Sequence, residues 1–252
     1  MTEITLTVDG APVTVAAGAS LKDAALARGV HVPTLCWHPL FATGSNCRVC
    51  VVELQGSRTL VPSCTRLAEP GMVVSTDSER VRRARKLIFE LLLSQVDLSA
   101  AASVQAMAAY YGADPQRFAL TASERLGGGY GGRVAAEEAS HPPQVAVPPV
   151  ADNPFFVRDY ARCILCQRCT EACGEGVQFT FAISVVGRGS GASIGTGGTG
   201  ELPDSPCVFC GNCVGACPTG ALQPVPNFAA ARAGEWAPVA VEWSPEKGVS
   251  PR

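Results

Sequence analysis

The sequence lacks several features that mark common protein classes. It contains no run of about 18 or more apolar residues, so we expect no membrane-spanning helix. Its first residues show neither the basic start nor the apolar centre of a secretory signal peptide, which predicts a cytoplasmic location. It has no P-loop motif, and its net charge of −2 argues against a general nucleic-acid-binding protein.

Cysteine, by contrast, is abundant, with 12 residues that fall into three groups. Thiols stay reduced in the cytoplasm, so grouped cysteines there indicate metal binding rather than disulfides. Cysteines that merely filled a hydrophobic core would be scattered along the chain, whereas here none lies outside a group. The sequence therefore predicts metal centres.

The first group has the spacing C-x10-C-x2-C-x13-C. A [2Fe–2S] cluster needs two thiolates on each iron, and three ligands on one loop with a fourth beyond a hairpin meet that need. A four-cysteine zinc site normally shows two C-x2-C pairs, whereas this group has one pair and two long gaps. We therefore assign this group to a [2Fe–2S] cluster, with ligands Cys36, Cys47, Cys50 and Cys64.

The residues around the first group predict a small sheet with one helix. Residues 4–8 and 13–15 alternate polar and apolar side chains around a turn at 9–10, and Ser20 with Asp23 forms a capping box that begins a helix. This pattern is typical of the β-grasp fold of plant-type ferredoxins. Small loop residues (Ala42, Gly44, Ser45) leave room for backbone N–H groups to approach cluster sulfurs. Further strands are predicted at 51–54, 59–62 and 72–74.

The second and third groups share the spacing C-x2-C-x2-C-x3-C, and Pro218 follows the last cysteine, whereas Gly174 follows the first run. This is the pattern of bacterial ferredoxins with two [4Fe–4S] clusters, in which the fourth cysteine of each run binds the other cluster. Three thiolates then face one cluster from a tight turn, and we expect the fourth to begin a helix. Residues 178–186, between the runs, predict a strand. We assign one cubane to Cys163, Cys166, Cys169 and Cys217, and the other to Cys207, Cys210, Cys213 and Cys173.

The segment between the first and second groups predicts two helices and an irregular connector. A capping box of Thr76 and Glu79 begins an apolar stripe at helical spacing, and residues 100–111 predict a second helix. The glycine-rich residues 127–132 match G-x-G-x-x-G, but no convincing strand precedes them, which favours a flexible connector over a dinucleotide site. Basic residues of the first helix predict a solvated face or a docking face for an acidic partner, namely Arg80, Arg82, Arg83, Arg85 and Lys86.

These motifs resemble a known family. Residues 1–94 resemble the N-terminal domain of the large iron–sulfur subunit of respiratory complex I. That domain recurs in NAD-linked formate dehydrogenases and in the diaphorase part of NAD-reducing [NiFe]-hydrogenases. Residues 153–223 resemble the formate dehydrogenase and hydrogenase relatives. The stretches that carry the resemblance are 32–39, 47–53, 62–65, 71–74, 153–156, 187–189 and 217–222.

One expected motif is missing. The family usually continues with a [4Fe–4S] site held by one histidine and three cysteines, but residues 95–103 contain neither residue type. A cluster cannot be held without thiolates, so we infer that this site has been lost while its helices remain. Electrons must then pass directly from the first cluster to the later ones, or through a cluster of a partner. We expect His31, His38 and His141 to be structural or surface residues.

The resemblance implies an electron-relay subunit of a cytoplasmic, multi-subunit NAD(P)-linked oxidoreductase. A flavin subunit that binds the nicotinamide would dock near the [2Fe–2S] domain, and a subunit that oxidises formate or hydrogen would dock near the cubanes. No substrate-converting site is expected on this chain itself. Only 30 residues follow Leu222, too few for the large molybdopterin domain of the formate dehydrogenases, so the chain resembles a stand-alone relay subunit.

Three other functions are open at this point. The chain is also suited to feeding another complex-I-like reductase or to acting as a free ferredoxin-type carrier. A redox sensor belongs to a different class, and one labile cluster would suit it better than three. The fold class that we predict is α+β, with a β-grasp [2Fe–2S] ferredoxin domain, a helical segment and a bacterial two-[4Fe–4S] ferredoxin domain. The expected units are 1–77 ([2Fe–2S] domain), 78–112 (helical segment), 113–152 (connector), 153–223 (two-[4Fe–4S] domain) and 224–252 (C-terminal tail).

We predict about ten irons per chain, because one [2Fe–2S] cluster and two cubanes hold that number. Metal analysis of the anaerobically isolated protein checks this prediction. About fourteen irons would instead reveal a third cubane and contradict the inferred loss of the histidine-ligated site.

Overall fold

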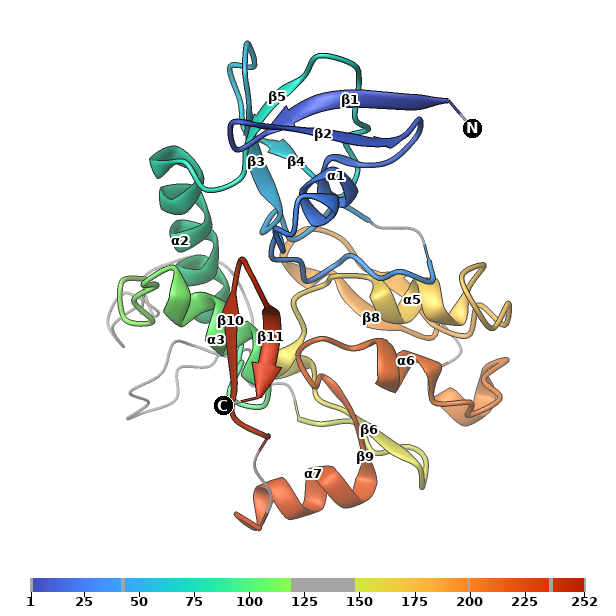
Figure 1. Cartoon of the computed structure of the whole chain (residues 1–252). Helices are drawn as coiled ribbons and strands as arrows, with labels where there is room; N and C mark the ends of the chain where they lie inside the picture. The colour runs from blue at the N-terminus through green and yellow to red at the C-terminus, as the bar shows by residue number, and fades with distance from the viewer. Residues whose placement is uncertain (1, 42–43, 119–147, 199, 236–237, 252) are drawn as a thin grey trace.

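The computed structural model describes residues 2–41, 44–118, 148–198, 200–235 and 238–251. The glycine-rich residues 127–132 and His141 therefore lie outside the described residues. The chain has three main parts (Figure 1). They are an N-terminal sheet, a part with the two cysteine-bearing helices α5 (Arg168–Cys173) and α6 (Asn212–Ala216), and a helical layer with a C-terminal hairpin. No helix in the described ranges is long and apolar enough to cross a membrane.

The first part is a five-stranded sheet with the order β2-β1-β5-β3-β4. β1 and β5 run parallel, and the other neighbouring strands pair antiparallel. The turn between β1 and β2 takes φ values of 47° at Asp9 and 78° at Gly10, the left-handed pair that suits a two-residue hairpin. The predicted strands are confirmed with shifted ends: β1 (Glu3–Val8), β2 (Ala11–Ala16), β3 (Val51–Leu54), β4 (Val61–Pro62) and β5 (Val73–Ser75).

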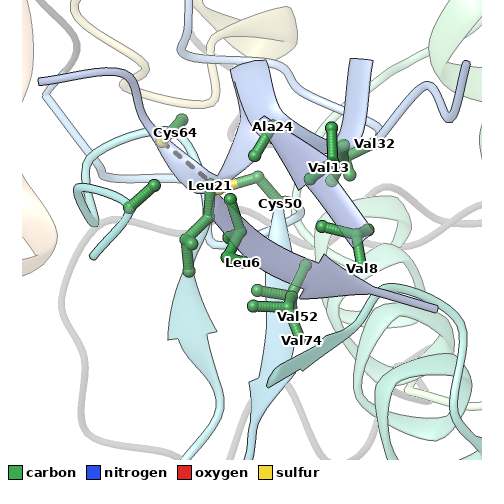
Figure 2. Close-up of a cluster of buried hydrophobic side chains, with 12 residues drawn as sticks. Leu6, Val8, Val13, Leu21, Ala24, Val32, Cys50, Val52, Cys64 and Val74 are labelled. Carbon is green, nitrogen blue, oxygen red and sulfur yellow. Dashed lines mark hydrogen bonds between the residues drawn. The ribbon is translucent and has the colours of Figure 1, made fainter. Parts of the chain in front are cut away.

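Helix α1 (Leu21–Ala27) packs across this sheet and closes its core. The predicted capping box is present: Ser20 accepts from the N–H of Asp23, and the Asp23 carboxylate accepts from the N–H of Ser20. Cys50 and Cys64 belong to the same buried cluster as Leu6 and Val52 (Figure 2). Two of the predicted ligands are therefore fixed by the hydrophobic core itself.

Helices α2 (Glu79–Leu93) and α3 (Ala102–Tyr110) form the predicted helical segment. The prediction that Thr76 caps the first helix is wrong, because Ser78 is its N-cap and accepts from the N–H of Val81. The hydroxyl of Thr76 instead donates to the carboxylate of Asp9 at 2.6 Å, which ties the helix entry to the hairpin turn.

The basic residues of α2 do not all share one solvated face. Arg85 is only 2 % exposed, and its guanidinium donates to the hydroxyl of Tyr111 at 2.7 Å and to the carbonyl of Val51 at 2.8 Å. A buried cation is tolerated when its N–H groups find such partners. Arg85 thus joins α2 to α3 and to the strand that follows Cys50, and the sequence prediction of a surface position was wrong for it.

The C-terminal residues form a hairpin that packs on α3 (Figure 1). Its strands are β10 (Val241–Ser244) and β11 (Gly248–Pro251). Trp243 is buried and contacts Tyr110 and Tyr111, with ring centroids at 4.9 and 5.5 Å. The backbone N–H of His31 donates to the carbonyl of Pro245 at 2.6 Å, so the hairpin also contacts the sheet domain.

The remaining elements surround the second and third cysteine groups. Short two-stranded ladders pair β6 with β9 and β7 with β8. Phe156, Ile183, Ile194, Leu202 and Leu222 form the apolar core of this part together with several of the cysteines. The elements are β6 (Phe156–Arg158), β7 (Ser184–Val186), β8 (Ser193–Gly195), β9 (Leu222–Pro224), α7 (Val225–Arg232) and the 3-10 turns Tyr160–Arg162, Gly189–Gly191 and Leu202–Asp204.

We predict that Trp243→Ala destabilises the chain by about 3–5 kcal/mol, the range for deleting a large buried aromatic side chain. The expected result is a lower urea midpoint of the far-ultraviolet circular dichroism under anaerobic conditions. Val249→Ala is the matched control on the same hairpin, because this side chain is 51 % exposed and should leave the midpoint unchanged. Equal midpoints for the two variants would show that the hairpin does not support the helical layer.

Candidate metal centres

The first cysteine group is brought together from three segments of the sheet domain. Cys36 follows α1, Cys47 and Cys50 precede β3, and Cys64 follows β4. Cys36, Cys50 and Cys64 are buried, and Cys47 is partly buried. The sulfurs of Cys50 and Cys64 are 3.3 Å apart (Figure 2). The structure thus gathers all four predicted ligands at the end of the sheet.

Hydrogen bonds among these thiols shift their pKa values in opposite directions. Contacts from Cys47 and Cys64 hold the pKa of Cys36 well below its usual range, whereas the contact with Cys36 and burial raise the pKa of Cys47. The contact with Cys64 lowers the pKa of Cys50 to about 7. The four sulfurs therefore share protons within one group, and iron binding would release them because thiolates are the ligands.

The loop that carries Cys47 contains two residues in the left-handed region. Ser45 has a φ of 51° and Arg48 a φ of 58°, on either side of the cysteine. Such a conformation costs about 1–3 kcal/mol for a residue with a side chain. In this loop the backbone N–H groups of Asn46 and Cys47 contact the sulfur of Cys36. The sequence predicts that Ser45, as a small residue, leaves room for backbone N–H groups near the cluster. Ala42, named for the same reason, lies outside the described residues. Arg48 was missed, because arginine carries no sequence signal for this conformation.

Two cavities hold the other eight cysteines, four in each. Cys163, Cys166, Cys169 and Cys217 line one cavity, together with Tyr160, Ile194 and Leu222. The second cavity is lined by Cys207, Cys210, Cys213 and Cys173. These sets contain the residues that the crossed assignment places together. The ligation itself stays a prediction.

The prediction that the fourth cysteine of each run begins a helix is wrong. Cys173 is the last residue of α5, and Cys217 is the C-cap of α6, so each helix begins near the third cysteine and ends at the fourth. The spacing of three residues between them is about one helical turn, which moves the fourth sulfur to the neighbouring cavity. Because α5 packs on α6, the fourth cysteine of each run lines the cavity of the other run.

The two cysteine runs repeat the same backbone conformation. Leu165 and Gln167 have φ values of 52° and 65°, and the equivalent positions Phe209 and Gly211 have 52° and 77°. These turns direct the N–H groups of Leu165 and Phe209 to the sulfurs of Cys163 and Cys207, each at 3.4 Å. Hydrogen bonds to cysteine sulfur stabilise the thiolate form and are one determinant of cluster potential.

The segment after the run Cys163–Cys173 also donates hydrogen bonds to a cysteine sulfur, which the sequence did not reveal. Residues 178–183 are not a strand as predicted, and only Ser184–Val186 is one. Phe179 and Phe181 adopt left-handed φ values of 57° and 53°. This bend brings the N–H of Ala182 within 3.2 Å and the hydroxyl of Thr180 within 3.3 Å of the Cys173 sulfur.

Burial dominates the electrostatics of both cavities. It raises the pKa of Cys166 and of Cys213 to about 12, and it also raises the pKa of Cys169. Thiols in such surroundings stay neutral at pH 7 unless a metal displaces their protons. Thiols that burial holds neutral are therefore matched to an iron–sulfur cluster, which supplies the compensating positive charge when it binds.

The donor chemistry and the space fit the predicted clusters. No three His, Cys, Asp or Glu side chains in the described part of the chain converge as the ligands of a single ion would. Eight of the cysteines instead line two cavities, four in each, which matches the four thiolate ligands of a cubane. His38 stacks on Phe41 at 4.2 Å and His31 packs against Gly248, so neither histidine lines a cysteine cavity.

Comparison with known proteins identifies both cysteine-rich parts. Residues 1–79 match the 2Fe-2S iron-sulfur cluster binding domain, and residues 162–221 match the 4Fe-4S dicluster domain. These matches confirm the predicted fold class and cofactors: one [2Fe–2S] cluster and two [4Fe–4S] clusters.

Similar full-length proteins are subunits of NAD(P)-linked oxidoreductases. The NADP-reducing hydrogenase subunit HndD of Solidesulfovibrio fructosivorans is 35 % identical over 88 % of this chain and 36 % of its own length. The mitochondrial NADH-ubiquinone oxidoreductase 78 kDa subunit of Candida albicans is 31 % identical over 92 % of this chain and 30 % of its own length. The chain thus spans about a third of the length of these curated relatives.

A solved structure is similar along most of the chain. A chain from the crystal structure of NAD+-reducing [NiFe]-hydrogenase in the H2-reduced state has a TM-score of 0.69 and 29 % sequence identity. The match covers 88 % of this chain and 87 % of that chain. The predicted resemblance to hydrogenase and complex I iron–sulfur subunits is therefore confirmed.

Double cysteine variants test the crossed ligation. If Cys163 and Cys217 serve one cubane, C163A/C217A loses only that cubane and retains about six irons, whereas C163A/C173A loses both cubanes and retains about two. Iron analysis with electron paramagnetic resonance (EPR) of the reduced proteins measures both variants. The reverse result would show that each run binds its own cluster.

Proposed function

We propose that this chain, which combines a 2Fe-2S domain with a 4Fe-4S dicluster domain, relays electrons in a multi-subunit NAD(P)-linked oxidoreductase. When bound, the clusters supply one-electron redox chemistry, and the chain's own residues bind them, shield them and hold them near one another. The proposed ligand sets are Cys36, Cys47, Cys50 and Cys64; Cys163, Cys166, Cys169 and Cys217; and Cys207, Cys210, Cys213 and Cys173.

The observation that carries this proposal is the direct contact between two cysteine-bearing loops. Arg168, between Cys166 and Cys169, donates to the carbonyl of Leu35 at 3.3 Å, and Leu35 directly precedes Cys36. Asn46, which directly precedes Cys47, points its amide at the carbonyl of Cys166 at 3.5 Å. This contact supports an electron route within the chain from the [2Fe–2S] site to the cubane site of Cys163, Cys166, Cys169 and Cys217, here called the Cys163 site. The route does not need the histidine-ligated cluster, whose ligands the sequence lacks.

The cavity lined by Cys207, Cys210, Cys213 and Cys173, here called the Cys207 site, reaches the surface of the chain. Cys210 is exposed, whereas every other cysteine is buried or partly buried. Apolar side chains lie beside this opening, with Val208 57 % and Phe155 58 % exposed. Exposed apolar residues around a redox site suit a partner that must come close. We therefore place the catalytic subunit here and the NAD(P)-binding flavin subunit near the [2Fe–2S] domain.

Hydrogen is the substrate that we favour for the catalytic partner, with formate as the other candidate. Two of the similar proteins are named as hydrogenases, one NADP-reducing and one NAD+-reducing. The reduced thiols that the clusters need favour a cytoplasmic location for the assembly.

Anaerobic isolation of the tagged chain with its partners tests this function. We expect co-purification of a flavin-containing subunit and bleaching of the iron–sulfur absorbance on addition of NADH or NADPH. Nickel in the isolated assembly indicates hydrogen, and molybdenum or tungsten indicates formate. A monomer that carries all its clusters but no partner would favour the free electron carrier instead.

Val208→Asp should reduce electron flow to the catalytic subunit at least tenfold, because a charge in an apolar contact opposes docking. Reduction of the clusters by NAD(P)H should stay unchanged in the same variant. Val239→Asp is the matched control, since Val239 is 76 % exposed and lines neither cysteine cavity. Equal activity in the two variants would place the docking surface elsewhere.

A further inference from the structure

Arg168 occupies the junction between two metal sites. It is the first residue of α5, and the left-handed Gln167 before it turns the chain into this helix. Its guanidinium reaches the carbonyl of Leu35 on the opposite loop. The side chain therefore extends from the Cys163 site to the [2Fe–2S] site.

The guanidinium has no carboxylate partner in the described part of the chain. None of the ion pairs found there includes Arg168. Its Nε atom is buried without a hydrogen bond, and the side chain as a whole is partly buried. Such a cation is costly unless negative charge lies nearby.

The groups on either side of this cation are proposed cluster ligands, which are thiolates when a cluster is bound. Arg168 lies between Cys166 and Cys169 in the chain, and its hydrogen bond reaches Leu35, which directly precedes Cys36. One fixed charge thus acts on both ligand sets.

Backbone packing holds the two loops in this relation. A Cβ atom added to Gly176 would lie 2.3 Å from the Cβ of Phe41, closer than real Cβ contacts allow. The absence of a side chain at Gly176 lets Phe41 lie directly against the turn after α5. Arg168 joins the same two segments through its hydrogen bond to Leu35.

We propose that Arg168 is a shared counter-charge that raises the reduction potentials of the [2Fe–2S] cluster and of the Cys163 cubane together. Each one-electron reduction adds negative charge to a cluster, and a nearby fixed cation stabilises the reduced form. The same charge weakens the repulsion between two reduced clusters on either side of it. The inference rests on the ligand sets of the proposed function.

A redox titration followed by EPR tests the role of Arg168 in the anaerobically isolated full chain. In Arg168→Gln, the ratio of reduced to oxidised cluster at a fixed potential should fall at least tenfold for these two clusters, equivalent to about 59 mV. The Cys207 cubane serves as the internal reference and should change less than threefold. Arg83→Gln removes the same charge from an exposed position on α2 and should leave all three potentials unchanged.

Arg168→Lys distinguishes the effect of the positive charge on the potentials from the effect of the side chain's shape. It keeps the positive charge, so both ratios should stay within about threefold of the parent chain even if Arg168→Gln fails to retain its irons. A tenfold fall in Arg168→Lys would overturn the inference, because charge would then not be the cause.

Unchanged potentials in Arg168→Gln, or a shift confined to one cluster, would also overturn the inference and leave the relay function standing. A parent chain without about ten irons and three cluster signals would instead refute the proposed function itself.

Discussion

The direct packing of two cysteine-bearing loops is the constraint on which the rest of this structure depends. Polypeptide is a poor conductor of electrons, so redox sites that exchange electrons must lie close together and away from water. Here the loop that contains Cys36 and Cys47 touches the loop that contains Cys166 through Arg168 and Asn46. Gly176, which has no side chain, leaves room for Phe41 against the turn that follows α5.

The other elements hold this junction in place. The β-grasp sheet buries Cys50 and Cys64 in its own core. The helical layer of α2 and α3 has no cysteine or histidine ligand and is closed instead by aromatic packing, in which Trp243 of the C-terminal hairpin takes part. The helical layer is thereby a structural support of the chain.

Strained backbone recurs at several places where N–H groups contact a cysteine sulfur. Left-handed residues occur beside Cys47 and at equivalent positions of both later runs, and again at Phe179 and Phe181. Most of these residues are not glycine, so the conformation is imposed by the surrounding fold at an energetic cost. The shared feature is a set of backbone donors around thiolates, which the protein can use to set cluster potentials.

The sequence by itself determined the three cysteine sets, the hairpin at Asp9-Gly10 and the capping box at Ser20, because these depend on spacing and local turn chemistry. Only the tertiary structure decided that Arg85 is buried, that residues 178–183 bend toward Cys173, and that Ser78 rather than Thr76 caps α2. It also decided the place of Arg168. Several of these outcomes depend on partners far away in the chain: Arg85 on Val51, Thr76 on Asp9 and Arg168 on Leu35. A local pattern carries no information about which distant group will satisfy a charge or a hydrogen-bond donor.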